Sequence, residues 1–492
     1  MSIFTQTNDG FLGDVMPYYW DGKYHAFYIK AALHAKRQIS VLPPGSPYKG
    51  DQFWLEFFRA GREAVSSPVA HLVSSDLVHW EEWPLVIQPS GVEGDPDPIG
   101  CWTGSFIERN GVFHLFYTGF AGDDKPQTTC HATSTDLREW KKDPKNPIMK
   151  ADPRWYAPMD WRDPIVFWNE EEGLYWMVFC ARIKEGPANR RGCLGLATSP
   201  DLEQWEIRPP IWVPHLHYAH ECPDIFRLGD RWVLLYSDFS DRWSTHYRVS
   251  DSLYGPWQAF TEDTLDSPHF YAAKTTTDGK RRFLFGWSPT SHGNVDKGLW
   301  EFGGCMVIHE LSILPDGRLV TQPVPEIEQQ FSQEIPIALH PYYGEWKQEK
   351  DAIMVPNING SAACTIAELS ECCRVTARIS CSEATQSCGL LIYADATLDS
   401  GYQIRWEPGK NRVVFDRWPR PGNEPFMVDR WLPPVNNGTT LDINIHIDGT
   451  ELVAYLNNTV ALTHRIYDHR VGKLGLFVTD GEAAFTNVRC FC

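Results

Sequence analysis

Residues 110–119 read Asn110-Gly111-Val112-Phe113-His114-Leu115-Phe116-Tyr117-Thr118-Gly119, a glycine turn followed directly by a run of aromatic and aliphatic side chains. A turn dipeptide before such a run is typical of a β-hairpin. The same arrangement returns four more times: Asp21-Gly22 before 24–29, Glu172-Gly173 before 174–181, Gly229-Asp230 before 231–237, and Asp278-Gly279 before 281–287. Repetition of one short unit predicts an array of similar β-modules.

A second repeat supports this prediction. Ser75-Asp76-Leu77-Val78-His79-Trp80 returns at 135–140 and 200–205, and in a looser form at 250–257. The Asp starts a tight turn by bonding its own backbone, and the Trp that follows anchors the next strand in a core. Five inner strands and four such corners predict a five-bladed β-propeller, because radial repetition leaves few sheet edges exposed.

The sequence pattern changes from about residue 338. Short alternating strands follow, separated by the turns Pro408-Gly409, Asp448-Gly449 and Asp480-Gly481. Regular strand spacing without a helical period predicts a β-sandwich. This part gathers no catalytic residue types, so it is interpreted as a supporting or sugar-contacting module.

The chain is therefore expected to be all-β and to divide into three parts. These are a five-bladed β-propeller over residues 1–322, a linker over 323–340 and a C-terminal β-sandwich over 341–492. Pro325 in the linker suits the first position of a short helix. The segment 30–67 is an insertion that we expect to cover one rim of the ring.

Composition favours a carbohydrate partner. The net charge is −18, and phosphate binding needs a basic surface, so neither a nucleic acid nor an anionic membrane is expected as a partner. The 21 tryptophans suit a β-rich protein and also suit sugar binding, where flat rings stack on sugar faces. The sequence does not indicate an oligomeric state.

Residues 1–6 contain neither a basic nor an apolar segment, and no later run is long enough to cross a membrane. A cytoplasmic location is therefore expected, whereas a chain from which an export signal had been removed would be secreted. The 13 cysteines are scattered without Cys-x-x-Cys pairs, which predicts reduced thiols. No motif indicates a metal or another cofactor, so none is expected.

Three acidic residues stand at the start of apolar runs, each beside a proline: Asp14, Asp163 and Glu221. The starts of the innermost propeller strands converge on the axis, so these carboxylates are expected to meet. Cleavage of a glycosidic bond with retention needs a carboxylate nucleophile and a second carboxyl that gives and then takes a proton, roughly 5–5.5 Å apart. Burial and mutual repulsion raise one pKa and keep that acid protonated.

Several short motifs occur in order along the chain: Trp102-Thr103-Gly104-Ser105, Arg162-Asp163-Pro164, Glu221-Cys222-Pro223, 270–275, 285–287 and 300–324. Together they resemble the motifs of glycoside hydrolase family 32, the invertase, inulinase and levanase group. The resemblance spans nearly the whole chain, including the predicted sandwich. It implies a retaining glycoside hydrolase that cleaves β-fructofuranosyl bonds in sucrose or fructans.

The resemblance also implies roles for single residues. Asp14 takes the place of the family's nucleophile, with an offset of one residue, Asp163 matches the transition-state stabiliser, and Glu221 matches the general acid/base. The remaining residues expected to bind substrate are Arg162, Trp102, Ser105, Tyr271 and Cys222.

The segment around Asp14 departs from the family pattern, because it lacks the flanking Asn residues. Asp9 is a competing nucleophile, but it stands too far from the first repeated strand. Three alternatives therefore stay open: another furanosidase of arabinan type, a fructosyltransferase that uses the same covalent intermediate, and a non-catalytic carbohydrate-binding propeller.

Overall fold

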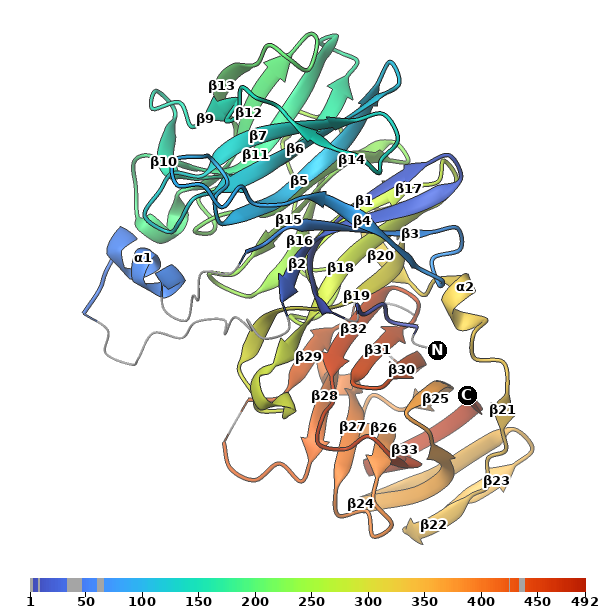
Figure 1. Ribbon diagram of the computed structural model, residues 1–492. Coiled ribbons are helices and arrows are strands. Elements are labelled where there is room, and N and C mark those ends of the chain that lie inside the picture. The colour runs from blue at the N-terminus through green and yellow to red at the C-terminus, as the bar shows by residue number, and fades with distance from the viewer. Residues whose placement is uncertain (1–2, 8, 33–46, 60–65, 424, 433–438) are drawn as a thin grey trace.

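The computed structural model describes residues 3–7, 9–32, 47–59, 66–423, 425–432 and 439–492. Nearly all regular structure in these ranges is antiparallel β-sheet, arranged as two bodies (Figure 1). The larger body, coloured blue to yellow, holds five blades around a common axis. The smaller body, coloured orange to red, is a two-layered sheet assembly. The predicted propeller followed by a sandwich is confirmed.

Each blade begins with an innermost strand: β1 (Gly10–Trp20), β5 (Gly100–Arg109), β10 (Tyr156–Asn169), β14 (Glu221–Leu228) and β17 (Tyr271–Thr277). The second strands are β2 (Lys23–Ala32), β6 (Val112–Phe120), β11 (Leu174–Ile183), β15 (Arg231–Asp238) and β18 (Arg282–Ser291). The outer strands are β3 (Val69–Ser74), β4 (Glu81–Ile87), β7 (Thr128–Ser134), β8 (Lys141–Lys142), β9 (Met149–Lys150), β12 (Gly192–Ser199), β13 (Glu206–Trp212), β16 (Ser244–Ser250), β19 (Trp300–Ile313) and β20 (Leu319–Gln322).

The ring of blades closes on itself. Consecutive innermost strands contact one another in the order β1, β5, β10, β14, β17 and back to β1. The first and fifth blades also share one sheet, because β1 pairs with β19 at Leu12 and Gly304. Chain segments from the two ends of the propeller thereby hold the ring together.

The five repeated turn-and-strand units form the second strand of each blade, one place further from the axis than predicted. Asn110-Gly111, for example, is the turn between β5 and β6. The reason is burial: the second strand lies between neighbouring strands and blades, so its sequence is mostly apolar. The innermost strand lines the axis and therefore carries the polar residues.

The Asp-Leu-Trp repeat forms the predicted corners. Two backbone N–H groups donate to Asp76 Oδ1, and the indole of Trp80 donates to a backbone carbonyl. The same bonds recur around Asp136 and Asp201. Each indole then packs edge-on against a phenylalanine in a neighbouring blade: Trp80 on Phe285, Trp140 on Phe27, and Trp205 on Phe116.

The C-terminal strands are β22 (His340–Tyr343), β23 (Lys347–Glu349), β24 (Ala352–Leu369), β25 (Cys372–Cys381), β26 (Ser387–Ala394), β27 (Gly401–Glu407), β28 (Arg412–Trp418), β29 (Val428–Trp431), β30 (Thr440–Asp448), β31 (Glu451–Leu456), β32 (Val460–Arg465) and β33 (Gly472–Phe491). The long strand β33 pairs with β24, β25 and β26 and so connects the layers. Between the two bodies, α2 (Pro325–Glu328) has Pro325 at its first turn. The strand β21 (Glu334–Ile335) already pairs with β33.

One helix, α1 (Asp51–Arg59), lies in the predicted insertion, whose residues 33–46 and 60–65 are outside the described ranges. Trp54 of α1 packs against Tyr218 and Phe239. These two residues belong to loops at one end of the third and fourth blades. The helix therefore lies against this rim, at the left of Figure 1.

Two global properties bear on the sequence predictions. Among the described residues, no helix has the length and apolar character needed to cross a bilayer. All 13 cysteines are free thiols.

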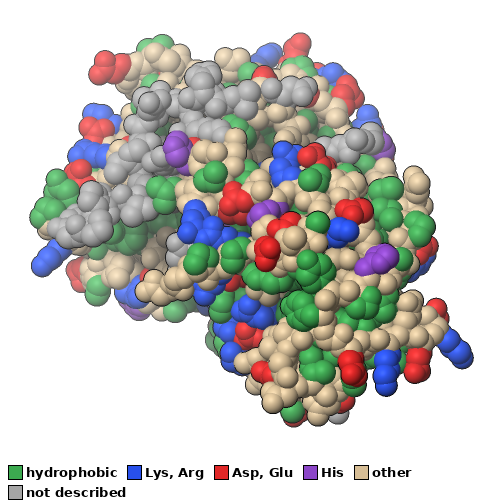
Figure 2. Space-filling model, turned by 90° about the horizontal axis from the view of Figure 1, so that it is seen from below, with side chains coloured by type: hydrophobic (Ala, Val, Ile, Leu, Met, Phe, Trp, Pro, Cys, Tyr) green, Lys and Arg blue, Asp and Glu red, His purple; other side chains and the backbone are tan. Residues whose placement is uncertain are grey.

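Figure 2 shows acidic and basic side chains interspersed on the face seen from below, without a patch of one sign.

A buried carboxylate ties the propeller to the sandwich. Asp266, between β16 and β17, accepts hydrogen bonds from the backbone N–H and the hydroxyl of Thr463 at 2.7 and 2.6 Å. It also contacts His309 Nε2 at 2.9 Å, and the other ring nitrogen of His309 contacts Tyr455 OH at 2.9 Å. Burial raises the pKa of Asp266, but the bonds from His309 and Thr463 outweigh it and hold that pKa below its ordinary value.

We expect Asp266→Asn to lower the melting temperature by several degrees, because an amide cannot accept at both positions. Each buried donor left without an acceptor costs about 1–3 kcal/mol. Scanning calorimetry of the full chain measures the change. Since the folded-state pKa of Asp266 is depressed, the stabilisation is present at neutral pH and is lost below about pH 4, as the pH falls from the unfolded pKa through the folded one.

Asp442→Asn is the matched control, because Asp442 forms an exposed pair with Arg378 at 2.6 Å in the sandwich. An exposed pair of this kind contributes about 0–1 kcal/mol. Equal losses in the two variants would contradict the role assigned to Asp266.

Candidate active site

All five innermost strands are interrupted where their pairing with the second strand shifts. The shifts fall between Gly13 and Val15, Trp102 and Gly104, Arg162 and Ile165, Glu221 and Asp224, and Tyr271 and Lys274. Each shift is a β-bulge, which bends a strand and redirects a side chain. Four residues at these bulges have a left-handed φ: Asp14 at 28°, Asp163 at 58°, Cys222 at 47° and Ala272 at 53°. Such strain persists only where the surrounding structure over-determines it, and it is concentrated at functional sites.

The bulge in the first blade presents Asp14 to side chains of three other blades. The hydroxyl of Thr103 donates to Asp14 Oδ2 at 2.7 Å, and the indole N–H of Trp287 donates to Oδ1 at 2.9 Å. Cys222 Sγ lies 3.9 Å from Oδ2. Both carboxylate oxygens are thus oriented, which fixes the direction in which Asp14 can react.

Asp163 is the most enclosed of the three predicted acids, with only 4% of its side chain exposed. Its Oδ2 accepts the backbone N–H of Cys222 at 2.9 Å, and its own N–H donates to Thr118 Oγ1 at 2.8 Å. The bulge at Cys222 is what turns that N–H toward the carboxylate. Asp163 is therefore held from both neighbouring blades.

Glu221 is the first residue of β14, and 21% of its side chain remains exposed. Arg162 donates to its Oε1 through Nε at 3.2 Å and Nη2 at 3.0 Å. The hydroxyl of Tyr271 donates to Oε2 at 2.7 Å, and the Tyr271 ring stacks on Trp243. Glu221 is thus fixed by hydrogen bonds and remains accessible from solvent.

The three carboxyls act on one another electrostatically. Burial raises the pKa of Asp14, and the charge of Glu221 raises it further. Burial likewise raises the pKa of Asp163, with a further contribution from the charge of Asp14. Burial raises the pKa of Glu221 more than Arg162 lowers it, and the charge of Asp163 adds to the rise. The structure therefore brings Asp14, Asp163 and Glu221 into one site, where at least one proton is readily retained.

Arg162 is itself held by a second layer of buried charges. Its Nη1 donates to Asp160 Oδ1 at 2.8 Å. Asp160 Oδ2 accepts from Arg182 at 3.2 Å and from the hydroxyl of Tyr218 at 3.0 Å. Sequence reasoning missed Asp160, although it stands two residues before Arg162 and therefore on the same face of β10.

The other predicted residues lie in different surroundings. Trp102 stacks on Phe120, with ring centroids 3.8 Å apart. Ser105 Oγ accepts the backbone N–H of Val166 at 2.9 Å and lines a separate hollow of about 170 Å³ on the axis. Ser105 therefore bonds to the backbone of the third blade, and the hollow that it lines is not the one around the three carboxyls. Its predicted role, like that of Trp102, stays a prediction.

Two further acids lie away from this site: Asp224, three residues after Glu221, and Asp9, the competing nucleophile of the sequence analysis. Asp224 accepts the N–H and the hydroxyl of Thr275, at 2.8 and 2.7 Å, and so ties β14 to β17. Asp9 is exposed and forms an ion pair with Lys30 at 2.7 Å.

Three residues of the site were not assigned a role from the sequence: Thr103, Trp287 and Lys274. The buried Lys274 donates to Pro223 O at 3.1 Å, and its charge lowers the pKa of Asp14 and of Asp163. All three stand inside the quoted motifs at 102–105, 285–287 and 270–275. Aligning the five innermost strands would have identified Thr103, because it occupies the bulge of its blade.

Comparison with known proteins gives the family of the chain. A model of the family described as Glycosyl hydrolases family 32 N-terminal domain matches residues 52–323, more than half of the chain. The chain therefore belongs to glycosyl hydrolases family 32, which confirms the resemblance seen in the motifs.

Individual proteins resemble the chain in sequence or in structure. The chain is 29% identical to sucrose-6-phosphate hydrolase from Escherichia coli, over 65% of this chain and 63% of that protein. It spans about three fifths of the length of the curated relatives that it matches first. Among solved structures, exo-inulinase from Aspergillus awamori superposes with a TM-score of 0.72 and 18% identity, covering 100% of this chain and 97% of that one. Fructan 1-exohydrolase IIa from Cichorium intybus in complex with 1-kestose gives 0.69 and 19%, covering 99% and 97%.

Proposed function

We propose that this protein hydrolyses β-fructofuranosyl bonds in sucrose or fructans, with retention of configuration. The observation that carries the proposal is the set of three carboxyls, delivered by bulges in three different blades and held within electrostatic reach of one another. Membership of family 32 supports the substrate class. The names of the relatives extend that class to sucrose phosphate as well as sucrose and fructans.

In the proposed reaction, Asp14 is the nucleophile and Glu221 is the general acid/base. Asp14 attacks the anomeric carbon while the bond to the leaving oxygen breaks and Glu221 gives that oxygen its proton. Water then attacks the same carbon, Glu221 takes a proton from it, and Asp14 is released as a carboxylate. Asp163 accepts hydrogen bonds from sugar hydroxyls, which strengthen as positive charge develops on the ring.

The contacts of Asp14 and Glu221 agree with these roles. Burial raises the pKa of Asp14, but the donors on its two oxygens oppose that rise and so favour the carboxylate that a nucleophile must be. Burial raises the pKa of Glu221, which favours the protonated acid. Glu221 is also more exposed than Asp163, as an acid must be if it is to meet a leaving group near the solvent.

Sugar release from a panel of substrates tests the activity. We expect free fructose from sucrose, sucrose 6-phosphate, 1-kestose, inulin or levan, measured by chromatography. No release is expected from aryl α-L-arabinofuranosides. Arabinose release would indicate the arabinan-type furanosidase, and growth of the fructan chain would indicate a transferase. Sugar binding without release from any substrate would favour a non-catalytic propeller.

Substitution of the two reacting carboxyls tests the roles. Glu221→Ala should lower kcat/KM by about 10²–10⁴-fold, and Asp14→Ala should abolish turnover because no covalent intermediate can form. Sodium azide should restore turnover only in Glu221→Ala and give a fructosyl azide of retained configuration, since azide needs no general base.

Asp9→Ala is the matched control for the nucleophile, because Asp9 is the exposed acid nearest in sequence. It should retain the activity of the unchanged chain. A fully active Asp14→Ala, or an inactive Asp9→Ala, would move the nucleophile away from Asp14.

Thr103→Val tests the environment of Asp14 through the pH profile. The hydrogen bond from Thr103 lowers the pKa of Asp14, so its removal raises that pKa. Because the nucleophile must be ionised, the acid limb of kcat/KM against pH should move to higher pH. Thr290→Val is the control, since its hydroxyl faces Glu301, 3.4 Å away, in another part of the fifth blade. A shift toward lower pH in Thr103→Val would contradict the role of Asp14.

A further inference from the structure

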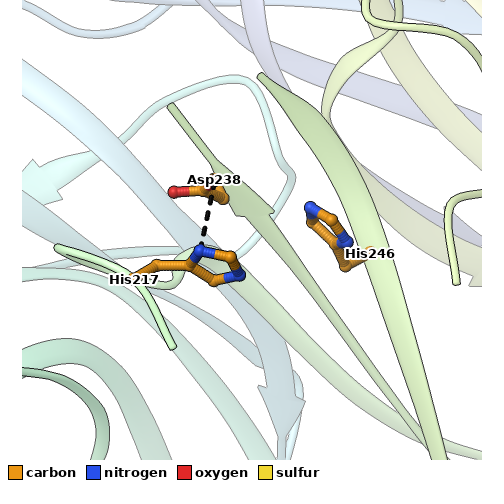
Figure 3. Close-up of side chains that lie close together, drawn as sticks. All are labelled: His217, Asp238 and His246. Atoms are coloured by element: carbon orange, nitrogen blue, oxygen red, sulfur yellow. Dashed lines mark ion pairs between the residues drawn. The ribbon is translucent and has the colours of Figure 1, made fainter. Parts of the chain in front are cut away.

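A cluster of side chains of metal-binding types lies beside the proposed active site. His217 stands in the loop before β14, Asp238 ends β15, and His246 lies in β16 (Figure 3). All three residues are buried, with 9%, 0% and 4% of their surfaces exposed. One potential ligand atom from each lies within 4.8 Å of the other two.

His246 is oriented as metal-binding histidines usually are. Its Nδ1 contacts Asp263 Oδ1 at 3.0 Å, while the buried Nε2 has no hydrogen-bond partner. In metal sites, a carboxylate commonly holds the far nitrogen of the imidazole so that the near nitrogen faces the ion. The ring also stacks on Tyr236, with centroids 5.3 Å apart, which restricts its rotation. A buried nitrogen without a partner requires an explanation, and a bound cation supplies one.

The carboxylate of Asp238 is also fixed in place. Its Oδ1 accepts from the N–H of Ser240 at 2.9 Å, and its Oδ2 accepts from the N–H groups of Asp241 and Arg242 at 3.0 and 3.1 Å. His217 Nδ1 lies 3.3 Å from Oδ2, the contact drawn as a dashed line in Figure 3. Two atoms bound to a tetrahedral Zn²⁺ at about 2.0–2.1 Å lie roughly 3.3 Å apart. The spacing therefore suits a shared metal as well as a direct ion pair.

We propose that His217, Asp238 and His246 bind one divalent transition-metal ion. Two imidazoles and one carboxylate are ligands that Zn²⁺ accepts, whereas Ca²⁺ and Mg²⁺ prefer oxygen ligands alone. Asp241 Oδ2, 3.2 Å from His217 Nδ1, is a further oxygen close to the cluster. The remaining coordination position is left for this oxygen or for water.

Such an ion would position the general acid/base of the proposed reaction. The loop that carries His217 runs directly into Glu221, and the neighbouring Tyr218 donates to Asp160, which holds Arg162. In the sheet, Glu221 is paired with Ser237, the residue before Asp238. The ion would therefore fasten the loop to the ends of β15 and β16, and its role is structural.

Metal content and stability of the full chain test the proposal. After treatment with EDTA and dialysis, the protein should take up about one Zn²⁺ per chain by mass spectrometry, and Zn²⁺ should raise its melting temperature. Co²⁺ should give the visible bands of a nitrogen and oxygen site without a thiolate charge-transfer band. This last readout separates the proposed site from the 13 cysteines.

His246→Gln and Asp238→Asn should lose the zinc equivalent and the thermal shift. Asp263→Asn keeps all three ligands but frees the His246 ring, so its affinity should fall by about 10–100-fold even if the ligand variants do not fold. His220→Gln is the control, because His220 is a fully buried histidine of the same loop that lies outside the cluster. It should bind zinc as the unchanged chain does.

Three results would overturn the proposal. They are no zinc uptake by the stripped wild-type chain, unchanged zinc binding in a folded His246→Gln variant, and a Co²⁺ spectrum with thiolate character.

Discussion

The interruption of each innermost strand by a β-bulge is the constraint on which the site depends. In an unbroken strand, successive side chains alternate between the two faces, and neighbouring blades would bury most of them. At the bulges, Asp14, Asp163 and Cys222 are held at positive φ. Their side chains and N–H groups then meet those of the adjacent blades. The innermost and second strands of each blade hold its bulge in place. Together with the ring of blades, they supply the rigidity that keeps a non-glycine residue at positive φ.

Buried charge is the second constraint, and Arg162 is its centre. Arg162 binds Glu221 on one side and Asp160 on the other, while Asp160 is shared with Arg182. A buried charge without a partner is strongly destabilising, so removing one charged side chain of this network would leave its neighbour buried and unpaired. The result is that the carboxyl of Glu221 is fixed by a guanidinium and yet retains a raised pKa because burial dominates.

The outer parts of the molecule are repetitive, whereas the axis is not. The corners around Asp76, Asp136 and Asp201 make the same hydrogen bonds in three blades. At the bulges the residue type changes from blade to blade, and this variation produces one asymmetric site. The inter-body contacts of Asp266 join segments that are distant in the sequence, whereas the proposed metal cluster joins a loop and two strands of one blade.

The sequence by itself determined the fold class and the number of blades, and it singled out three acids that the structure brings close together. Those signals are local: a glycine turn, an Asp that bonds its own backbone and a proline beside a carboxyl all act within a few residues. Only the tertiary structure decided which strand lines the axis, and that Thr103 and Trp287 hold Asp14. It also decided that His217, Asp238 and His246 meet. These contacts join different strands and blades, and their geometry depends on bulges and ring closure, which no short stretch of sequence encodes.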